Sequence, residues 1–176
     1  MAELIGKRTI TKSKTEQKIN LRTLLGRKPT NEEKTLFAEL SVELINNRTL
    51  DGKDIDGKKF TKYSKAYAAK KGVPRSAVDL FLDGDMLDSI DLTGETRDTI
   101  AIGIIGGVDA LKSDNHNKGV TLPKREFFGV TRKEAESMIE SIRDDGDGDT
   151  TKTEARGFTL ADLAAALKQL DIEQTE

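Results

Sequence analysis

The sequence of 176 residues contains no cysteine and no tryptophan, a single histidine and three prolines. The lack of cysteine excludes disulfide bonds, thiol catalysis and metal or iron–sulfur sites with thiolate ligands. One histidine excludes a metal site built from several histidines. The longest apolar run, residues 100–108, contains three glycines and is too short to span a bilayer. Residues 1–10 lack the apolar stretch of a secretory signal. We therefore expect a soluble protein made in a reducing cytoplasm.

The composition is rich in charge and lean in core-forming residues. Charged residues make up 34% of the chain, hydrophobic residues 35% and aromatic residues 5%. The net charge is −2, but it is unevenly spread. Residues 1–28 hold eight Lys and Arg against two Glu, whereas residues 132–176 hold six against twelve acidic residues. Ends of opposite charge favour contact with oppositely charged surfaces or with copies of the same chain.

These patterns divide the chain into four parts. Residues 1–28 are expected to form a flexible basic arm, with a short helical face before Gly26 at most. Residues 29–145 are expected to form the core domain. Residues 146–158 are predicted to be a flexible acidic linker, and 159–176 a C-terminal amphipathic helix and tail. Such a short helix is not stable alone, so it must dock on its own domain or on a neighbour.

The core domain is predicted to be an α+β fold, with a small antiparallel or mixed sheet flanked by amphipathic helices. Isoleucines alternate through 98–105 and predict a strand, in which Gly103 marks a bulge or a close backbone approach. Capping boxes at Thr30 and Thr131, each with Glu three residues later, begin two helices. The first is expected to end near residues 46–47.

Shorter elements are predicted between these helices. Glycines indicate turns at 51–52, 56–57 and 93–95, and a basic helix over 64–71 is expected to stop at Gly72. A further helix is predicted over 108–117.

No catalytic, cofactor or metal site stands out. His116 has no nucleophile and acid at a spacing that forms a triad, so a structural role is favoured. The glycines of 103–107 lack the spacing and lysine of a phosphate-binding loop. The acidic run 144–149 fails the calcium-loop pattern, since position twelve counted from Asp145 is Arg156. We therefore expect no enzyme activity, no cofactor and no metal.

Three segments resemble, in the same order, the virion-morphogenesis or tail-completion family of tailed bacteriophages, also described as neck or head–tail joining proteins. The first is 56–72, with its Asp-Gly, an aromatic residue and a basic helix bearing Ser and Tyr. The second is 80–90, with leucines, Gly84, Met86 and Ser89. The third and most specific is 116–129, His-Asn-x-Gly followed by Pro-x-Arg-x-Phe-Phe-Gly. The resemblance covers residues 50–145. Phe60 and Phe128 replace the family's usual Trp and Leu.

The resemblance implies a non-catalytic structural protein of the virion, in a ring of probable hexameric order at the neck or the head-proximal end of the tail. Its partners would be itself, neighbouring neck and tail proteins and, transiently, exiting phage DNA, with no membrane contact. Segment 123–129 would pack at a subunit boundary, where Arg125 would donate to a carboxylate, and His116-Asn117 would fix the preceding loop. The implied assembly residues are Gly84, Met86, Ser89, His116, Asn117, Gly119, Pro123, Arg125, Phe127, Phe128 and Gly129.

Two other functions stay open at this point. The basic arm and the Lys58–Lys71 cluster, in which lysines alternate with aromatic residues, would suit a nucleic-acid-binding module. A small hydrolase using His116 and nearby acids is the third and weakest hypothesis.

Overall fold

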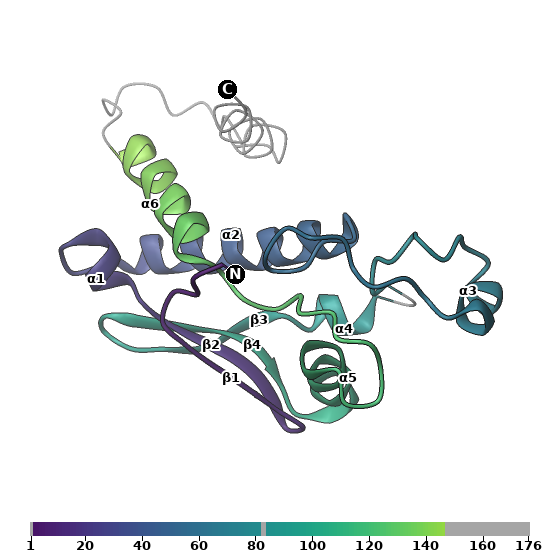
Figure 1. Cartoon of the computed structure of the whole chain (residues 1–176). Helices are drawn as coiled ribbons and strands as arrows, with labels where there is room; N and C mark the ends of the chain where they lie inside the picture. The colour runs from purple at the N-terminus through teal and green to yellow at the C-terminus, as the bar shows by residue number, and fades with distance from the viewer. Residues whose placement is uncertain (1, 82–83, 147–176) are drawn as a thin grey trace, which may run out of the picture. The chain divides into compact units, whose positions relative to one another are not determined.

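The computed structural model describes residues 2–81 and 84–146, which belong to one unit, Met1–Gly146. Four strands form an antiparallel sheet in the order β1-β2-β4-β3 (Figure 1). They are β1 (Lys7–Thr11), β2 (Lys14–Asn20), β3 (Asp91–Glu95) and β4 (Thr99–Ile105). The helices are α1 (Leu21–Leu25), α2 (Asn31–Leu50), α3 (Lys65–Lys71), α4 (Asp85–Asp88), α5 (Gly107–Lys118) and α6 (Arg132–Gly146). The predicted α+β class is confirmed. The predicted linker and C-terminal helix, from residue 147 onward, lie outside the described residues.

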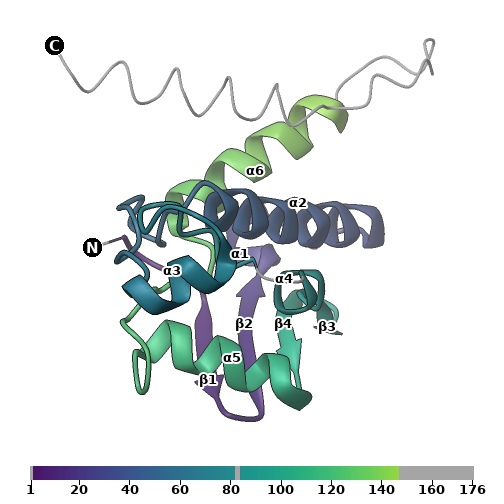
Figure 2. The same ribbon diagram turned by 90° about the vertical axis from the view of Figure 1, so that its right-hand side faces the viewer.

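The helices gather on one face of the sheet (Figures 1 and 2). Thr15 of β2 points to this face, since its hydroxyl lies 2.7 Å from that of Ser113 on α5. Because side chains alternate along a strand, Lys14 and Lys18 point to the opposite face. Lys7 of β1, opposite Lys18 in the register, joins them there. Within the described residues, no helix covers that second face.

The core lies between the sheet and the two long helices. Ile100 and Ile102 of β4 and Phe37 and Ile45 of α2 are fully buried, and Met138 of α6 is nearly so. Helix α2 packs against both β4 and α6. Both predicted capping boxes are present, at Thr30–Glu33 and Thr131–Glu134. The close approach predicted at Gly103 is confirmed, because a Cβ atom there would lie 2.1 Å from the carbonyl oxygen of Thr15.

The prediction that residues 1–28 form a flexible arm is wrong for most of that segment. It supplies β1, β2 and α1, so the folded unit begins well before residue 29. The sequence hides these strands because two inward positions of β2, Thr15 and Gln17, are polar, although both are fully buried. Only the short helix before Gly26 was foreseen, and Gly26 ends α1 in the left-handed region.

Two smaller predictions also need correction. Helix α2 continues to Leu50 instead of ending at 46–47, and its last turn buries Thr49, whose hydroxyl donates to the carbonyl of Ile45. Residues 93–95 form no turn. They belong to β3, where a bulge between Leu92 and Gly94 accommodates the glycine.

Candidate functional site

Residues 123–130 join α5 to α6 through the middle of the molecule without forming a helix or strand. We call this segment the strut. Phe127 and Phe128 are both fully buried, with their rings edge to face at 6.4 Å. Gly129 adopts φ +138°, and a Cβ atom there would lie 2.8 Å from Ile55. Residues 127–130 of the strut therefore belong to the core, where backbone polar groups need internal partners.

Long polar side chains from distant elements supply those partners. Arg48 at the end of α2 donates to the carbonyls of Phe127 (2.8 Å) and Gly129 (2.7 Å). Gln17 of β2 donates to the carbonyl of Val130 and accepts from its N–H. Sequence reasoning singled out neither Arg48 nor Gln17. The sequence signal that could have placed Gln17 on the inner face of a strand was its alternation, at every second residue, with Thr15 and Ile19.

His116 and Asn117 at the end of α5 contact the strut itself, whereas the resemblance implied that they fix the loop before it. The Asn117 side chain donates to the carbonyl of Ser113 (2.9 Å) and accepts from the N–H of Phe128 (3.1 Å). The carbonyl of His116 accepts from the N–H of Arg125 (2.8 Å). Gly119 ends α5 in the left-handed region, where a side chain would meet Lys124.

Arg125 makes its hydrogen bonds within its own chain, and a contact of this residue with a carboxylate across a subunit boundary stays a prediction. Its side chain is buried and donates within its own chain, from Nε to the carbonyl of Thr61 (2.9 Å) and from Nη2 to that of Lys62 (3.3 Å). The guanidinium also lies 5.2 Å from the ring centre of Tyr63. Burial lowers the pKa of Arg125, although Tyr63 and Tyr67 oppose the shift. Arg125 therefore attaches residues 61–63 to the strut.

Residues 61–81, including α3, form a projection at one end of the molecule (Figure 1). Its polar centre is the Tyr63 hydroxyl, which donates to Asp79 (3.1 Å) and accepts from the N–H of Leu80 (3.3 Å). Lys71 also donates to Asp79 and lies 5.3 Å from the Tyr63 ring centre. Burial opposes ionisation of Asp79, but the hydrogen bonds from Lys71, the N–H of Phe81 and Tyr63, together with the charge of Lys71, outweigh it and lower the pKa of Asp79. This cluster holds the projection together independently of the sheet.

A pocket of about 410 Å³ lies where the strut, the projection, α4 and α5 meet. All three segments of the phage-family resemblance contribute to it, although they are far apart in sequence. Among the predicted residues, Gly84, Met86, His116, Pro123 and Arg125 line it. The other lining residues are Tyr63, Ser64, Tyr67, Leu80, Lys112 and Leu122.

The remaining predicted residues lie outside the pocket and support it. Asn117, Gly119, Phe127, Phe128 and Gly129 hold the strut, as described above. The Ser89 hydroxyl donates to the carbonyl of Met86 (2.8 Å) at the end of α4. Gly84 begins α4 with φ +97°, a conformation that L side chains rarely adopt.

The wall of the pocket combines apolar groups with cations. His116 is neutral at pH 7, because burial, and then the charge of Arg125, lowers its pKa to about 4. Its Nδ1 atom is buried without a hydrogen-bond partner. Leu122 on the rim is 43% exposed. Such a pocket suits an apolar side chain of another molecule better than a reaction that needs His116 as a base.

Several exposed large apolar residues lie on or beside α5. Ile105, Val108, Leu111, Val120 and Leu122 lie on α5 or within four residues of its ends. Scattered exposed apolar residues are ordinary, but Leu122 also lines the pocket, and an exposed apolar residue at the rim of a pocket suits an interaction surface.

The Lys58–Lys71 cluster does not present the stacking surface that nucleic-acid binding would use. Phe60 and Tyr63 are buried, and Tyr63 packs against Tyr67 with ring centres 4.8 Å apart. The alternation of lysines with aromatic residues therefore reflects packing inside the projection.

Neither the family models, the curated proteins nor the solved structures contain a match to this chain. Within residues 2–81 and 84–146, no group of three or more His, Cys, Asp or Glu is placed to hold a metal ion. In that same part of the chain, no helix is long and apolar enough to cross a membrane.

Proposed function

We propose that this protein is a structural component of a tailed-phage virion, forming a ring at the neck or the head-proximal end of the tail. In that position it completes the tail or joins it to the head, and it performs no catalysis. The observation that carries the proposal is the convergence of three segments on one pocket. These are the segments that resemble the tail-completion family, and the fold brings them together from positions 63–67, 80–86 and 112–125.

The surface around the pocket supports an assembly role. Its apolar lining and the exposed Leu122 on its rim are costly to leave in water, and subunit contact would bury them. Full burial of one Leu side chain contributes about 2 kcal/mol, so a few such residues stabilise a specific contact.

Substitution of the pocket rim tests this proposal. Leu122→Asp places a charge on the rim and should prevent ring formation, measured as the mass of the purified protein by light scattering. The matched control is Val120→Asp, because Val120 is exposed but does not line the pocket. A monomeric Leu122→Asp protein beside an assembled Val120→Asp protein supports the proposal. Wild-type assembly of the Leu122→Asp protein would contradict it.

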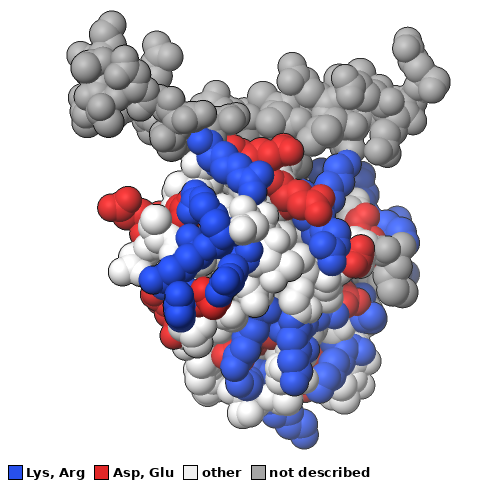
Figure 3. Space-filling model, turned by 90° about the vertical axis from the view of Figure 1, so that its left-hand side faces the viewer, with Lys and Arg blue, Asp and Glu red and all other residues white. Residues whose placement is uncertain are grey.

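One observation favours contact with nucleic acid as a second candidate function. Lysines of the basic N-terminal segment, Lys7, Lys14 and Lys18, share the helix-free face of the sheet. Lys and Arg side chains also gather on the lower part of the surface in Figure 3. Glu16 neutralises part of this charge, at 3.2 Å from Lys14 and 3.8 Å from Lys18.

Binding of random duplex DNA tests this candidate. It predicts an affinity that falls steeply with salt concentration, since phosphate contacts release counterions. The slope should decrease when Lys7, Lys14 and Lys18 are changed to Ala. Absence of binding at low salt would exclude a DNA-binding function for this face.

A further inference from the structure

The sheet has two edges that are free in the described residues. Strand β1 pairs with β2 alone, and β3 pairs with β4 alone. Within the described residues the outer edge of each strand therefore faces no further strand, and the N–H of Leu92 donates to the side chain of Asp91. An unpaired edge is a ready template for a strand from another chain.

The chain directions of β1 and β3 allow these two edge strands to pair with each other. All neighbouring strands in the order β1-β2-β4-β3 are antiparallel. The first and last strands of a four-stranded sheet of this kind run in opposite directions. A second copy that continues the sheet beyond β3 would thus place its β1 antiparallel to β3. Both strands are five residues long.

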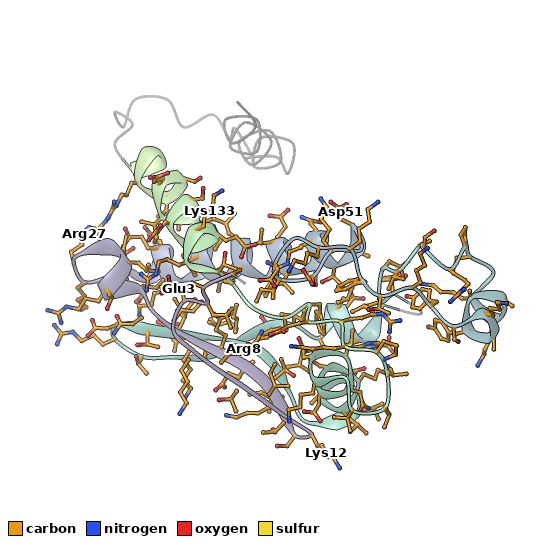
Figure 4. All side chains as sticks on the ribbon, in the orientation of Figure 1. Glu3, Arg8, Lys12, Arg27, Asp51 and Lys133 are labelled. Atoms are coloured by element: carbon orange, nitrogen blue, oxygen red, sulfur yellow. The ribbon has the colours of Figure 1, made fainter. Side chains whose placement is uncertain are left out.

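Their charges are complementary. Among the described residues, Lys7 at the start of β1 and Lys12 directly after it have no ion-pair partner, and neither does Asp91 of β3. Figure 4 shows Lys12 at the tip of the β1–β2 hairpin. Pairing β1 with β1, or β3 with β3, would bring like charges together. Pairing β1 with β3 brings opposite charges together, which favours this arrangement.

A groove lies beside the β3 edge and is acidic. It has a volume of about 550 Å³ between α2 and the start of β3. Its apolar lining comes from Ala38, Val42, Ile90 and Leu92. Its charged residues, Glu39, Glu43 and Asp91, are all acidic. The groove therefore suits a segment that is basic and carries an apolar residue.

Strand β1 is a basic segment of this kind, and its apolar residue is Ile10. Ile10 lies opposite Thr15 in the register, so its side chain points to the helix-covered face, which is the face of the groove. Placing Ile10 opposite Leu92 would put Thr9 opposite Thr93 and Thr11 opposite Asp91. Ile10 would then lie over the groove, with Lys12 close to its acidic residues. The bulge after Leu92 restricts regular pairing to the first part of β3.

We propose that β1 of one copy of this chain adds to the β3 edge of the next copy, with Ile10 opposite Leu92. The contact is head to tail, so repetition closes into a ring when the rotation between copies closes. This inference rests on the proposed function, since it names the surfaces through which the ring forms. Proteins also use bulges and lysines to prevent their edge strands from pairing with other chains, and both features occur here, in β3 and near β1. The experiment must therefore detect the pairing itself.

Cysteine cross-linking of the full-length protein tests the pairing, because the chain has no cysteine of its own. Directly opposed residues on antiparallel strands have Cβ atoms about 4.5–5.5 Å apart, close to the range of a disulfide. The variant carrying both Ile10→Cys and Leu92→Cys should form a ladder of covalent oligomers under mild oxidation. A mixture of the two single variants should stop at heterodimers. The matched control combines Ile10→Cys with Ile105→Cys, since Ile105 is exposed on β4, away from the β3 edge.

Native mass spectrometry of the wild-type protein separates the proposed ring from the proposed pairing of β1 with β3. An oligomer together with a ladder specific to positions 10 and 92 supports the pairing. An oligomer without that ladder, or with an equal ladder in the control, overturns the edge pairing and leaves the proposed ring standing. A monomer at concentrations up to about 100 μM, where even weak specific complexes associate, overturns both.

Discussion

The strut and the projection are held in different ways. The strut, residues 123–130, accepts hydrogen bonds from Arg48 and Gln17 and donates to Gln17 and Asn117, which lie on three separate elements. The projection, residues 61–81, is attached to the strut by Arg125 and is otherwise held by its own Tyr63–Asp79–Lys71 cluster. The difference indicates that the strut carries global stability, whereas the projection can adjust locally. The pocket lies between the two, with one rigid wall and one adjustable wall.

Arg48→Ala should have the largest effect on stability. It leaves the carbonyls of Phe127 and Gly129 without their donor and Glu134 without its partner at 2.6 Å. Loss of one partner of a buried pair costs about 3–5 kcal/mol of the free energy of unfolding, measured with urea. The control is Arg132→Ala, whose pair with Glu3 is exposed. Equal losses in both variants would show that the strut has no special role.

Asn117→Ala should have the next largest effect. It removes the acceptor for the N–H of Phe128 and the donor to Ser113, all of them buried. We expect a loss of about 2 kcal/mol in the free energy of unfolding, the usual cost of unsatisfied buried polar groups. Asn115→Ala, in the same helix but without this contact, should cost much less. A wild-type stability for the Asn117→Ala protein would contradict the account of the strut.

His116 makes the stability of the protein sensitive to acid. Its pKa is lowered from 6.5 to about 4, so the unfolded chain binds more protons between these values. Stability therefore falls as the pH decreases from 6.5 towards 4. At pH 5.5 the cost is about 1 kcal/mol relative to pH 8. In His116→Gln, urea unfolding at the two pH values should show a difference smaller by that amount. An unchanged difference would contradict the burial of this imidazole.

Arg125→Gln should have the smallest global effect. Its acceptors, the carbonyls of Thr61 and Lys62, belong to exposed residues that water can reach. We expect amide hydrogen exchange to rise by about tenfold in residues 61–81, with little change in α6, because local opening needs less free energy than unfolding. An equal rise in both regions would show that the projection and the core unfold together.

The sequence was sufficient to predict those helices and strands whose position is set by residues within the element or directly beside it. The alternating isoleucines of β4, the capping boxes at Thr30 and Thr131 and the glycines after α3 and α5 predicted these elements correctly. Strands β1 and β2 were missed because Thr15 and Gln17 face inward and find polar partners about 100 residues away. Patterns of apolar residues do not reveal such pairing.

The candidate site could be predicted in its residues but not in its geometry. The place of Asn117 directly before the loop that leads to the strut followed from the sequence, although it was expected to fix that loop and instead contacts Phe128 of the strut. The partners of Arg125 did not follow from the sequence, since they are backbone carbonyls about 60 residues earlier. A backbone carbonyl carries no sequence signature, so a carboxylate was expected instead. The convergence of the three segments on one pocket also required the fold.

The central claim is that this protein completes or joins the tail of a phage particle. Electron microscopy of particles assembled without this protein tests it most directly. Our account predicts filled heads beside separate or abnormally ended tails, and normal virions when the protein is restored. Joined and intact virions in its absence would contradict the account.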